Sequence, residues 1–147
     1  DLRLWCCFGE APLLDVLAHR LAHAPALADR VILLGAPSHD EMESRFRAAD
    51  FYLQTSHREG SGYSLIEALA CGATPLVTDI PATRQIVGVA GSLTPVGDSR
   101  SLGEAIVAWA ARDQPTLRRA ARARFDEVLT FDAIGRQLRS AYETLVR

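Results

Sequence analysis

The chain has 147 residues and a formal net charge of −2, and its apolar share is ordinary for a globular protein, so it is long enough to form one domain with its own core. The small negative charge gives no electrostatic basis for binding nucleic acid, and no apolar run approaches the roughly 20 residues that span a bilayer. All sixteen basic residues are Arg and there is no Asn, a bias typical of GC-rich bacterial genomes.

Apolar runs alternate with segments of helical periodicity along the chain. The runs at 2–8 and 31–34 predict strands that are buried on both faces, with Trp5 in the core. The alternation predicts an α/β fold with a doubly wound parallel sheet, and we expect a single domain over residues 1–147 because no linker interrupts it. The predicted order is strand 2–8, helix 12–23, strand 31–34, helix 40–49, strand 50–54, helix 64–71, strand 75–78, helix 81–87, strand 92–96, a helix capped by Asp98, and helices 117–129 and 132–146.

The three cysteines are Cys6, Cys7 and Cys71, whose spacing matches no zinc site. We expect reduced core thiols, because free cysteines are usually buried. No basic segment of a signal peptide precedes the first apolar run. We therefore expect a cytoplasmic protein without a metal site.

A glycine-rich turn follows the predicted strand 50–54 and leads into the helix at 64–71. Strand, glycine-rich turn and helix together form a layout that cradles phosphate, because the first amides of a helix have no partner within it. Gly60 and Gly62 let the backbone turn sharply and approach a ligand closely. Glu59 and Glu67 flank this turn, and their carboxylates suit the hydroxyl groups of a sugar and a ribose. The pattern favours a nucleotide sugar as the ligand.

Each candidate residue also has an interpretation without a ligand. Ser64-x-x-Glu67 matches a capping box at the helix start, and Glu59 alone could be a solvated loop residue. Arg58 could bind phosphate with two parallel hydrogen bonds or remain a solvated charge. We interpret His57 as an exposed loop residue rather than a general base.

A basic cluster lies on one of the last predicted helices. It could contact an anionic membrane surface from the cytoplasmic side. A solvated helix face is the favoured interpretation, because Asp126 and Glu127 follow at once. The cluster comprises Arg118, Arg119, Arg122 and Arg124.

Four motifs together resemble the retaining GT-B glycosyltransferases of family 4, also called glycosyl transferases group 1. The resemblance covers nearly the whole chain and implies the Rossmann-like C-terminal half of a GT-B fold, which holds a nucleoside diphosphate sugar. It also implies sugar transfer with retention of configuration, without a metal or other cofactor. The motifs are Arg30-Val31-Ile32-Leu33-Leu34-Gly35, Ala49-Asp50-Phe51, Glu59-x7-Glu67 and Ala70-Cys71-Gly72-Ala73-Thr74-Pro75.

The resemblance implies a role for each residue of the turn. Glu59 would be catalytic, accepting hydrogen bonds from hydroxyls of the transferred sugar, and Glu67 would hold the ribose. The segment 36–38 after Gly35 would lie near the base. We also include Gly35 and Arg58 among the donor-binding candidates, with both interpretations of Arg58 left open. The remaining donor-binding residues would be Gly60, Ser61 and Gly62 beside the sugar and diphosphate, and Tyr63 and Ser64 through their backbone amides.

The chain departs from the family in two respects. Ser61 replaces the usual Phe of the Glu-Gly-Phe-Gly turn. The family's donor domain also begins with a further central strand and helix, which carry an Arg and a Lys for the diphosphate and follow an N-terminal acceptor domain. This chain contains none of these. The place of the missing central strand is therefore filled by the chain's own remaining strands or by another chain, or the chain is part of a larger protein. The alternative function is a non-catalytic interaction domain that retains the half-fold.

Overall fold

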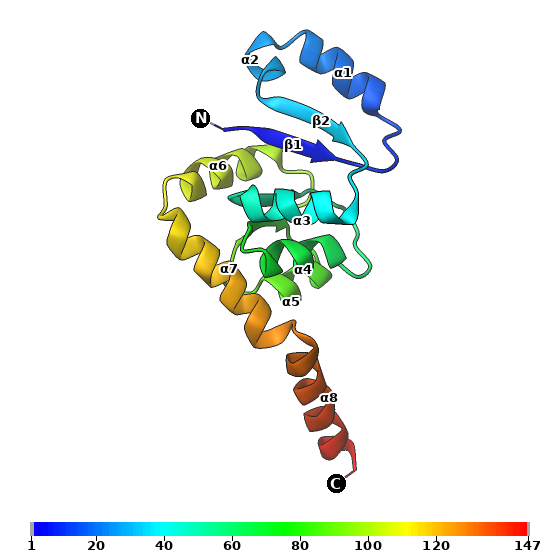
Figure 1. Cartoon of the computed structure of the whole chain (residues 1–147), viewed down its shortest axis with the longest axis vertical. Helices are drawn as coiled ribbons and strands as arrows, with labels where there is room; N and C mark the ends of the chain where they lie inside the picture. Colours follow the sequence, from blue (N-terminus) through cyan, green and yellow to red (C-terminus); the bar gives the residue numbers. More distant parts are fainter. Residues whose placement is uncertain (1, 147) are drawn as a thin grey trace. The chain divides into compact units, whose positions relative to one another are not determined.

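The computed structural model describes residues 2–146 (Figure 1). The chain divides into two compact units, Asp1–Met42 and Glu43–Arg147. Each unit contains its own parallel sheet, and within the described residues no ladder joins the two sheets.

The first unit is a two-stranded parallel sheet with two helices between its strands. Strand β1 (Leu4–Cys7) pairs with β2 (Val31–Gly35), and α1 (Leu14–Ala22) and α2 (Pro25–Ala28) connect them. Sequence analysis missed α2, which begins at a proline, a residue that suits the first helical position.

Burial of the first strand was predicted wrongly. Leu4 and Trp5 of β1 are 38% and 41% exposed, so Trp5 is not a core residue. Two strands and two short helices supply too little chain to cover both faces of a sheet. Cys6 and Cys7 are free and half-buried for the same reason.

Helix α3 (His39–Ala48) begins with a true capping box, which sequence analysis did not identify. The backbone amide of Ser38 donates to Glu41 Oε2 at 2.7 Å, and the amide of Glu41 donates to Ser38 Oγ at 3.4 Å. This reciprocal pair satisfies two amides at the start of the helix.

The second unit is built on three parallel strands in the order β3-β4-β5. All five residues of β4 are buried, as expected for the middle strand of a parallel sheet that helices cover. Helices α4, α5, α6 and α7 all contact β4, and the core forms mainly between β4 and the helices α4, α5 and α7. The elements are β3 (Phe51–Gln54), α4 (Tyr63–Ala70), β4 (Thr74–Thr78), α5 (Pro81–Val87), β5 (Ser92–Thr94), α6 (Ser99–Ala110), α7 (Gln114–Val128) and α8 (Phe131–Leu145).

The last three helices start with side-chain caps. Asp98 accepts a hydrogen bond from the amide of Ser101, as predicted, and Asp113 and Thr130 cap α7 and α8 in the same way. Within residues 2–146, no helix has both the length and the apolar character needed to cross a membrane.

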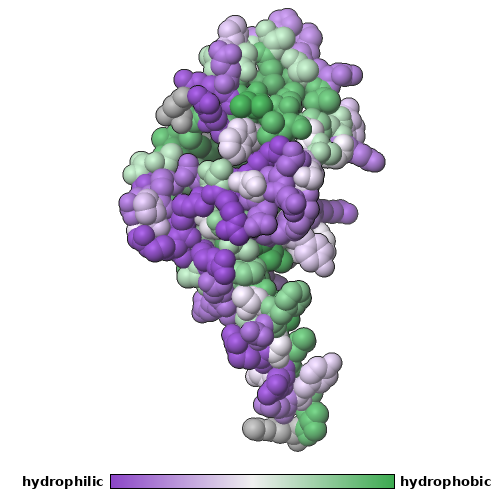
Figure 2. Space-filling model, in the orientation of Figure 1, coloured by the Kyte–Doolittle hydropathy of each residue, from purple (hydrophilic) through white to green (hydrophobic). Residues whose placement is uncertain are grey.

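Helix α8 carries apolar residues along one side and polar residues along the other (Figure 2). The apolar side is exposed along most of its length, although α8 contacts α7 near its start. The exposed residues at helical spacing are Phe131, Ile134, Leu138, Tyr142 and Leu145.

Candidate functional site

Strand β3 ends at Gln54, and the loop 55–62 connects it to α4. The loop therefore leaves the carboxyl end of a parallel strand, where α/β folds bind their ligands. This is the strand–turn–helix context predicted from the sequence.

The two candidate glutamates both act electrostatically on one tyrosine, Tyr52. Glu59 and Glu67 are both half-buried. Burial raises the pKa of Tyr52 to about 12, and the negative charges of Glu59 and Glu67 add to this rise, whereas a hydrogen bond with Ser64 opposes it. The Tyr52 phenol therefore lies within electrostatic range of both carboxylates and keeps its proton at neutral pH.

Two contacts fix the first part of the loop. Gln54 donates from Nε2 to the carboxylate of Glu59. Thr78, at the end of β4, donates from Oγ1 to the carbonyl oxygen of Ser56 at 2.6 Å. The ends of two neighbouring strands thus hold the loop that carries Glu59.

Gly62 forms the junction between the loop and α4. Its φ of +65° lies in the left-handed region, and a Cβ added there would come within 2.7 Å of Ile86 Cδ1. Glycine is therefore required at this position both for backbone conformation and for space.

The capping box that was the alternative interpretation of Ser64 and Glu67 does not form. Helix α4 begins at Tyr63 with Gly62 as its N-cap, and no side chain caps it. Ser64 is already the second helical residue, so Glu67 lies too far along the helix to return to the N-cap amide. The turn has instead started the helix one residue earlier, and its N-terminus carries no competing side chain.

Apart from the buried Gly62, the remaining candidate residues of the turn lie at the surface. Gly35, a candidate outside the turn, belongs to the first unit, where it ends β2 with a φ of +67°. Their roles toward a ligand stay predictions. The exposed residues are His57, Arg58, Gly60, Ser61, Tyr63 and Ser64.

The sequence suggested that the arginines of α7 form a solvated helix face. In the structure, three of them instead donate hydrogen bonds to backbone carbonyl oxygens. Arg118 donates to the carbonyl oxygens of Arg47, Ala49 and Cys71, at 2.7, 2.6 and 3.2 Å. These carbonyls lie at or just past the ends of α3 and α4, where helices leave acceptors unpaired.

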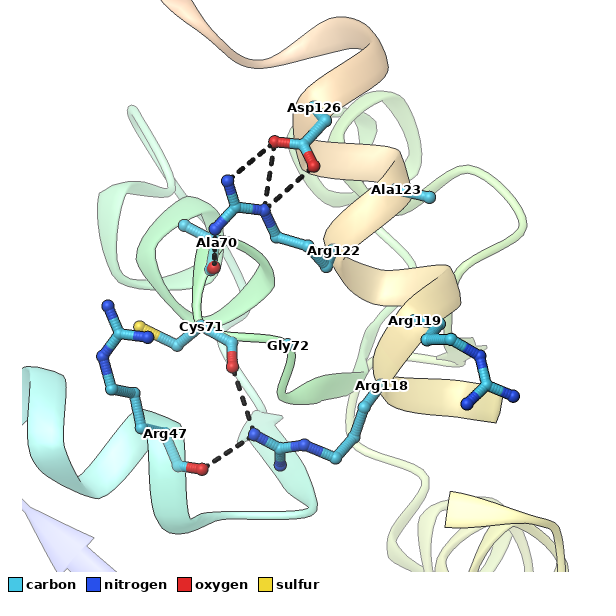
Figure 3. Close-up of a pocket in the computed structure, with 9 residues that line it drawn as sticks. All are labelled: Arg47, Ala70, Cys71, Gly72, Arg118, Arg119, Arg122, Ala123 and Asp126. Atoms are coloured by element: carbon cyan, nitrogen blue, oxygen red, sulfur yellow. Dashed lines mark hydrogen bonds and ion pairs between the residues drawn. The ribbon is translucent and has the colours of Figure 1, made fainter. Parts of the chain in front are cut away.

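Two further arginines bind helix ends in the same way. Arg122 donates to the carbonyl oxygen of Ala70 at 3.0 Å and pairs with Asp126 (Figure 3). Arg124 donates to the carbonyl oxygens of Gln85 and Ile86 in α5. Helix α7 thus supplies three cations to three helix C-termini, where the dipole also favours positive charge.

A surface hollow of about 430 Å³ lies beside these arginines, at the C-terminal end of α4. It is therefore at the opposite end of α4 from the candidate turn. Arg118 and Arg122 in its wall already bind carbonyl oxygens, and burial raises the pKa of the Cys71 thiol there. The thiol is thus protonated and unreactive at neutral pH, and we assign the hollow no chemistry.

Four residues that support the candidate turn were not predicted from the sequence: Tyr52, Gln54, Thr78 and Ile86. The first two could have been found, because alternate residues of a strand share a face and these two directly precede the motif. Thr78 and Ile86 follow the motif by many residues, and no local pattern marks them. Among residues 2–146, no cluster of His, Cys, Asp and Glu could hold a metal ion.

Comparison with known proteins relates the chain to one family. A sequence model of the family described as "Glycosyl transferases group 1" matches residues 2–112, which is most of the chain. The chain belongs to this family. The resemblance inferred from the sequence is confirmed at that level.

Among curated relatives, the chain is 29% identical over 148 residues to a phosphatidyl-myo-inositol mannosyltransferase of Mycobacterium leprae, covering 95% of this chain and 39% of the relative. It is 35% identical over 130 residues to a D-inositol 3-phosphate glycosyltransferase of Mycolicibacterium gilvum, covering 82% and 28%. The chain thus spans less than two fifths of the length of these relatives.

Solved structures confirm the Rossmann-like half of a GT-B fold. Sucrose-phosphate synthase from Thermosynechococcus elongatus matches with a TM-score of 0.77 and 26% identity, over 98% of this chain and 38% of that one. TarM matches with a TM-score of 0.74 and 20% identity, over 90% and 27%.

Proposed function

We propose that this chain is the donor-binding half of a retaining glycosyltransferase and binds a nucleoside diphosphate sugar. The observation that carries the proposal is the turn at 59–62. There, a left-handed Gly62 leads into an uncapped helix N-terminus, and the charges of two carboxylates act on one half-buried phenol. Family membership supports the same conclusion.

The geometry suits a diphosphate flanked by two hydroxyl-rich groups. The amides of Tyr63 and Ser64 open α4 without a side-chain cap, so an anion can accept their hydrogen bonds. Glu59 precedes this anion site and would accept hydrogen bonds from the transferred sugar. Glu67 lies one turn further along α4 and would accept them from the ribose.

In this proposal the chain positions the donor and stabilises charge on the leaving diphosphate. Oriented amides at a helix N-terminus stabilise an anion without reorganising as charge develops. Arg58, exposed beside the turn, would add a cation. The acceptor would bind to a second domain that closes over the site and excludes water.

The names of relatives suggest the first donor to test. They include mannosyltransferases, and one relative, from Xanthomonas oryzae, is named "GDP-mannose:cellobiosyl-diphosphopolyprenol alpha-mannosyltransferase". We therefore propose a nucleotide-activated hexose, with GDP-mannose as the first probe.

Calorimetric titration of the 147-residue chain with GDP and UDP tests the proposal. We expect dissociation constants near the millimolar range, because the chain has no Lys to pair with the diphosphate; one charge-assisted hydrogen bond contributes about 1.5–3 kcal/mol. Guanosine and uridine are the controls, since they lack the diphosphate and should bind more weakly. Absence of heat from both diphosphates would contradict the proposal and favour a non-catalytic interaction domain.

The chain alone should not transfer sugar at a useful rate, because the proposed acceptor site lies in another domain. Turnover of GDP-mannose onto an acceptor by the 147-residue chain would contradict this division of roles. Slow hydrolysis of the donor would not, because water needs no acceptor site.

A further inference from the structure

Gln54 has an arrangement that fold stability alone does not explain. Its Nε2 donates to the Glu59 carboxylate and, at 3.4 Å, to Ser56 Oγ. Its Oε1 is buried and has no hydrogen-bond partner among the described residues. Because a buried, unpaired amide oxygen costs free energy, an apolar side chain of similar size would suit the core at least as well.

Gln54 is also the contact that orients Glu59 itself. The loop is fixed at Ser56 by Thr78 and at Gly62 by the close approach of Ile86. Between these two points the backbone passes through Gly60, where an added Cβ would meet nothing within 4 Å. The loop has open space beside Gly60, and the hydrogen bond from Gln54 holds the Glu59 carboxylate there.

The hydrogen bond from Gln54 uses one oxygen of the Glu59 carboxylate and leaves the other for a ligand. Nε2 of Gln54 occupies Glu59 Oε2, which leaves Oε1 to accept from a donor outside the protein. A carboxylate fixed in advance loses less conformational entropy when it binds a hydroxyl group. Tyr52 lies on the same face of β3 two residues earlier, and its protonated phenol adds no competing charge.

We propose that Gln54 is a positioning residue: it orients Glu59 and thereby determines recognition of the transferred sugar, but not of the diphosphate. This inference rests on the proposed function. The measured quantity is the sugar contribution, defined as the dissociation constant of the free diphosphate divided by that of the nucleotide sugar.

The experiment is a double-mutant cycle on the 147-residue chain, using calorimetry with GDP and GDP-mannose and with UDP and UDP-glucose. The variants are Gln54→Leu, Glu59→Ala and the double variant. We expect Gln54→Leu to reduce the sugar contribution by on the order of ten-fold and to leave the affinity for the free diphosphate unchanged. In the Glu59→Ala background, Gln54→Leu should have no further effect, because Gln54 acts through Glu59.

A thermal unfolding measurement separates positioning from a structural role. Gln54→Leu removes a buried unpaired oxygen together with the hydrogen bond to Glu59, and because these two effects on stability oppose each other, its melting temperature should stay close to that of the wild type. Gln137→Leu is the matched control, since the Nε2 of Gln137, in α8, also donates a hydrogen bond, to the carbonyl oxygen of Val128 at the end of α7. It should leave all binding constants unchanged. If Gln54→Leu does not fold, Gln54→Met carries the same test.

The positioning role would be overturned if the two substitutions reduced the sugar contribution by factors that multiply in the double variant. It would also be overturned if Gln54→Leu weakened the binding of diphosphate and nucleotide sugar equally. A wild-type chain that binds the diphosphates but gains nothing from either sugar would overturn it too, while leaving the diphosphate site intact. A wild-type chain that binds neither diphosphate overturns the proposed function, and this inference with it.

Discussion

Arg124 of α7 donates from Nε to the carbonyl oxygen of Ile86 in α5 at 3.0 Å. The side chain of Ile86 in turn lies against Gly62, at the start of α4. Helix α7 therefore supports the candidate turn through Ile86, although no residue of α7 belongs to the Glu59-x7-Glu67 motif.

Replacing Arg124 with Met should lower the free energy of unfolding by about 1.5–3 kcal/mol, because two carbonyl oxygens of α5 lose a charged donor. Arg119→Met is the matched control on the same helix. Arg119 is exposed and donates to Thr116 within α7, so the change should stay within about 0.5 kcal/mol. Denaturant unfolding of both variants gives the comparison, and equal losses would contradict the support role of Arg124.

The two glycines of the turn should respond differently to alanine. Gly62→Ala places a Cβ in the left-handed region and against Ile86, so it should cost about 1–2 kcal/mol of stability or more. Gly60→Ala meets nothing within 4 Å and should change stability by less than about 0.5 kcal/mol. If the donor passes over Gly60, the same variant should nevertheless weaken GDP-mannose binding. If Gly60→Ala changes neither stability nor GDP-mannose binding, the ligand does not pass over this glycine.

The two glutamates should separate sugar from nucleotide in the proposed two-domain enzyme. Glu59→Ala should lower kcat and leave the affinity for the free diphosphate nearly unchanged, because its proposed contacts are to the transferred sugar. Glu67→Ala should weaken the free diphosphate, since the ribose is present in donor and product alike.

Thermal unfolding of Glu67→Ala provides the control. Because α4 has no side-chain cap, this variant should change stability by less than about 0.5 kcal/mol. Loss of diphosphate binding in Glu59→Ala together with normal binding in Glu67→Ala would reverse the two roles.

The pKa of Tyr52, measured by titration, should depend on the charges of both glutamates. Burial raises the pKa of Tyr52 to about 12 in the folded chain, against about 10 for a tyrosine in an unfolded chain. This contribution to stability is thus complete below about pH 10 and is lost as the pH rises through about 12. The ultraviolet absorbance of the phenolate measures the step, and Tyr52→Phe should abolish it.

Removing either neighbouring charge should shift that step to lower pH. Glu59→Gln should lower the pKa of Tyr52 more than Glu67→Gln, because Glu59 makes the larger contribution. Two variants with the wild-type step would show that neither carboxylate faces the phenol.

Local patterns were sufficient for much of the fold. The order of strands and helices in the second unit agrees with the sequence to within a few residues, because period-two and helical patterns, turn glycines and caps such as Asp98 act over a few positions. The strand, glycine turn and helix around Glu59 were predictable for the same reason.

The failures share one cause, which is that burial and side-chain partners depend on distant residues. Trp5 looked like a core residue, but a two-stranded sheet does not cover it. Ser64 looked like an N-cap, but the N-cap is Gly62, two residues earlier.

The sequence by itself determined a phosphate-type turn with two glutamates and membership of a glycosyltransferase family. Only the tertiary structure decided which side chains hold that turn. Arg118 and Arg47 are 71 positions apart and Arg124 and Ile86 are 38 apart, yet each pair shares a hydrogen bond. Such contacts arise when packed helices bring a guanidinium to an unpaired helix-end carbonyl, and no local pattern encodes that distance.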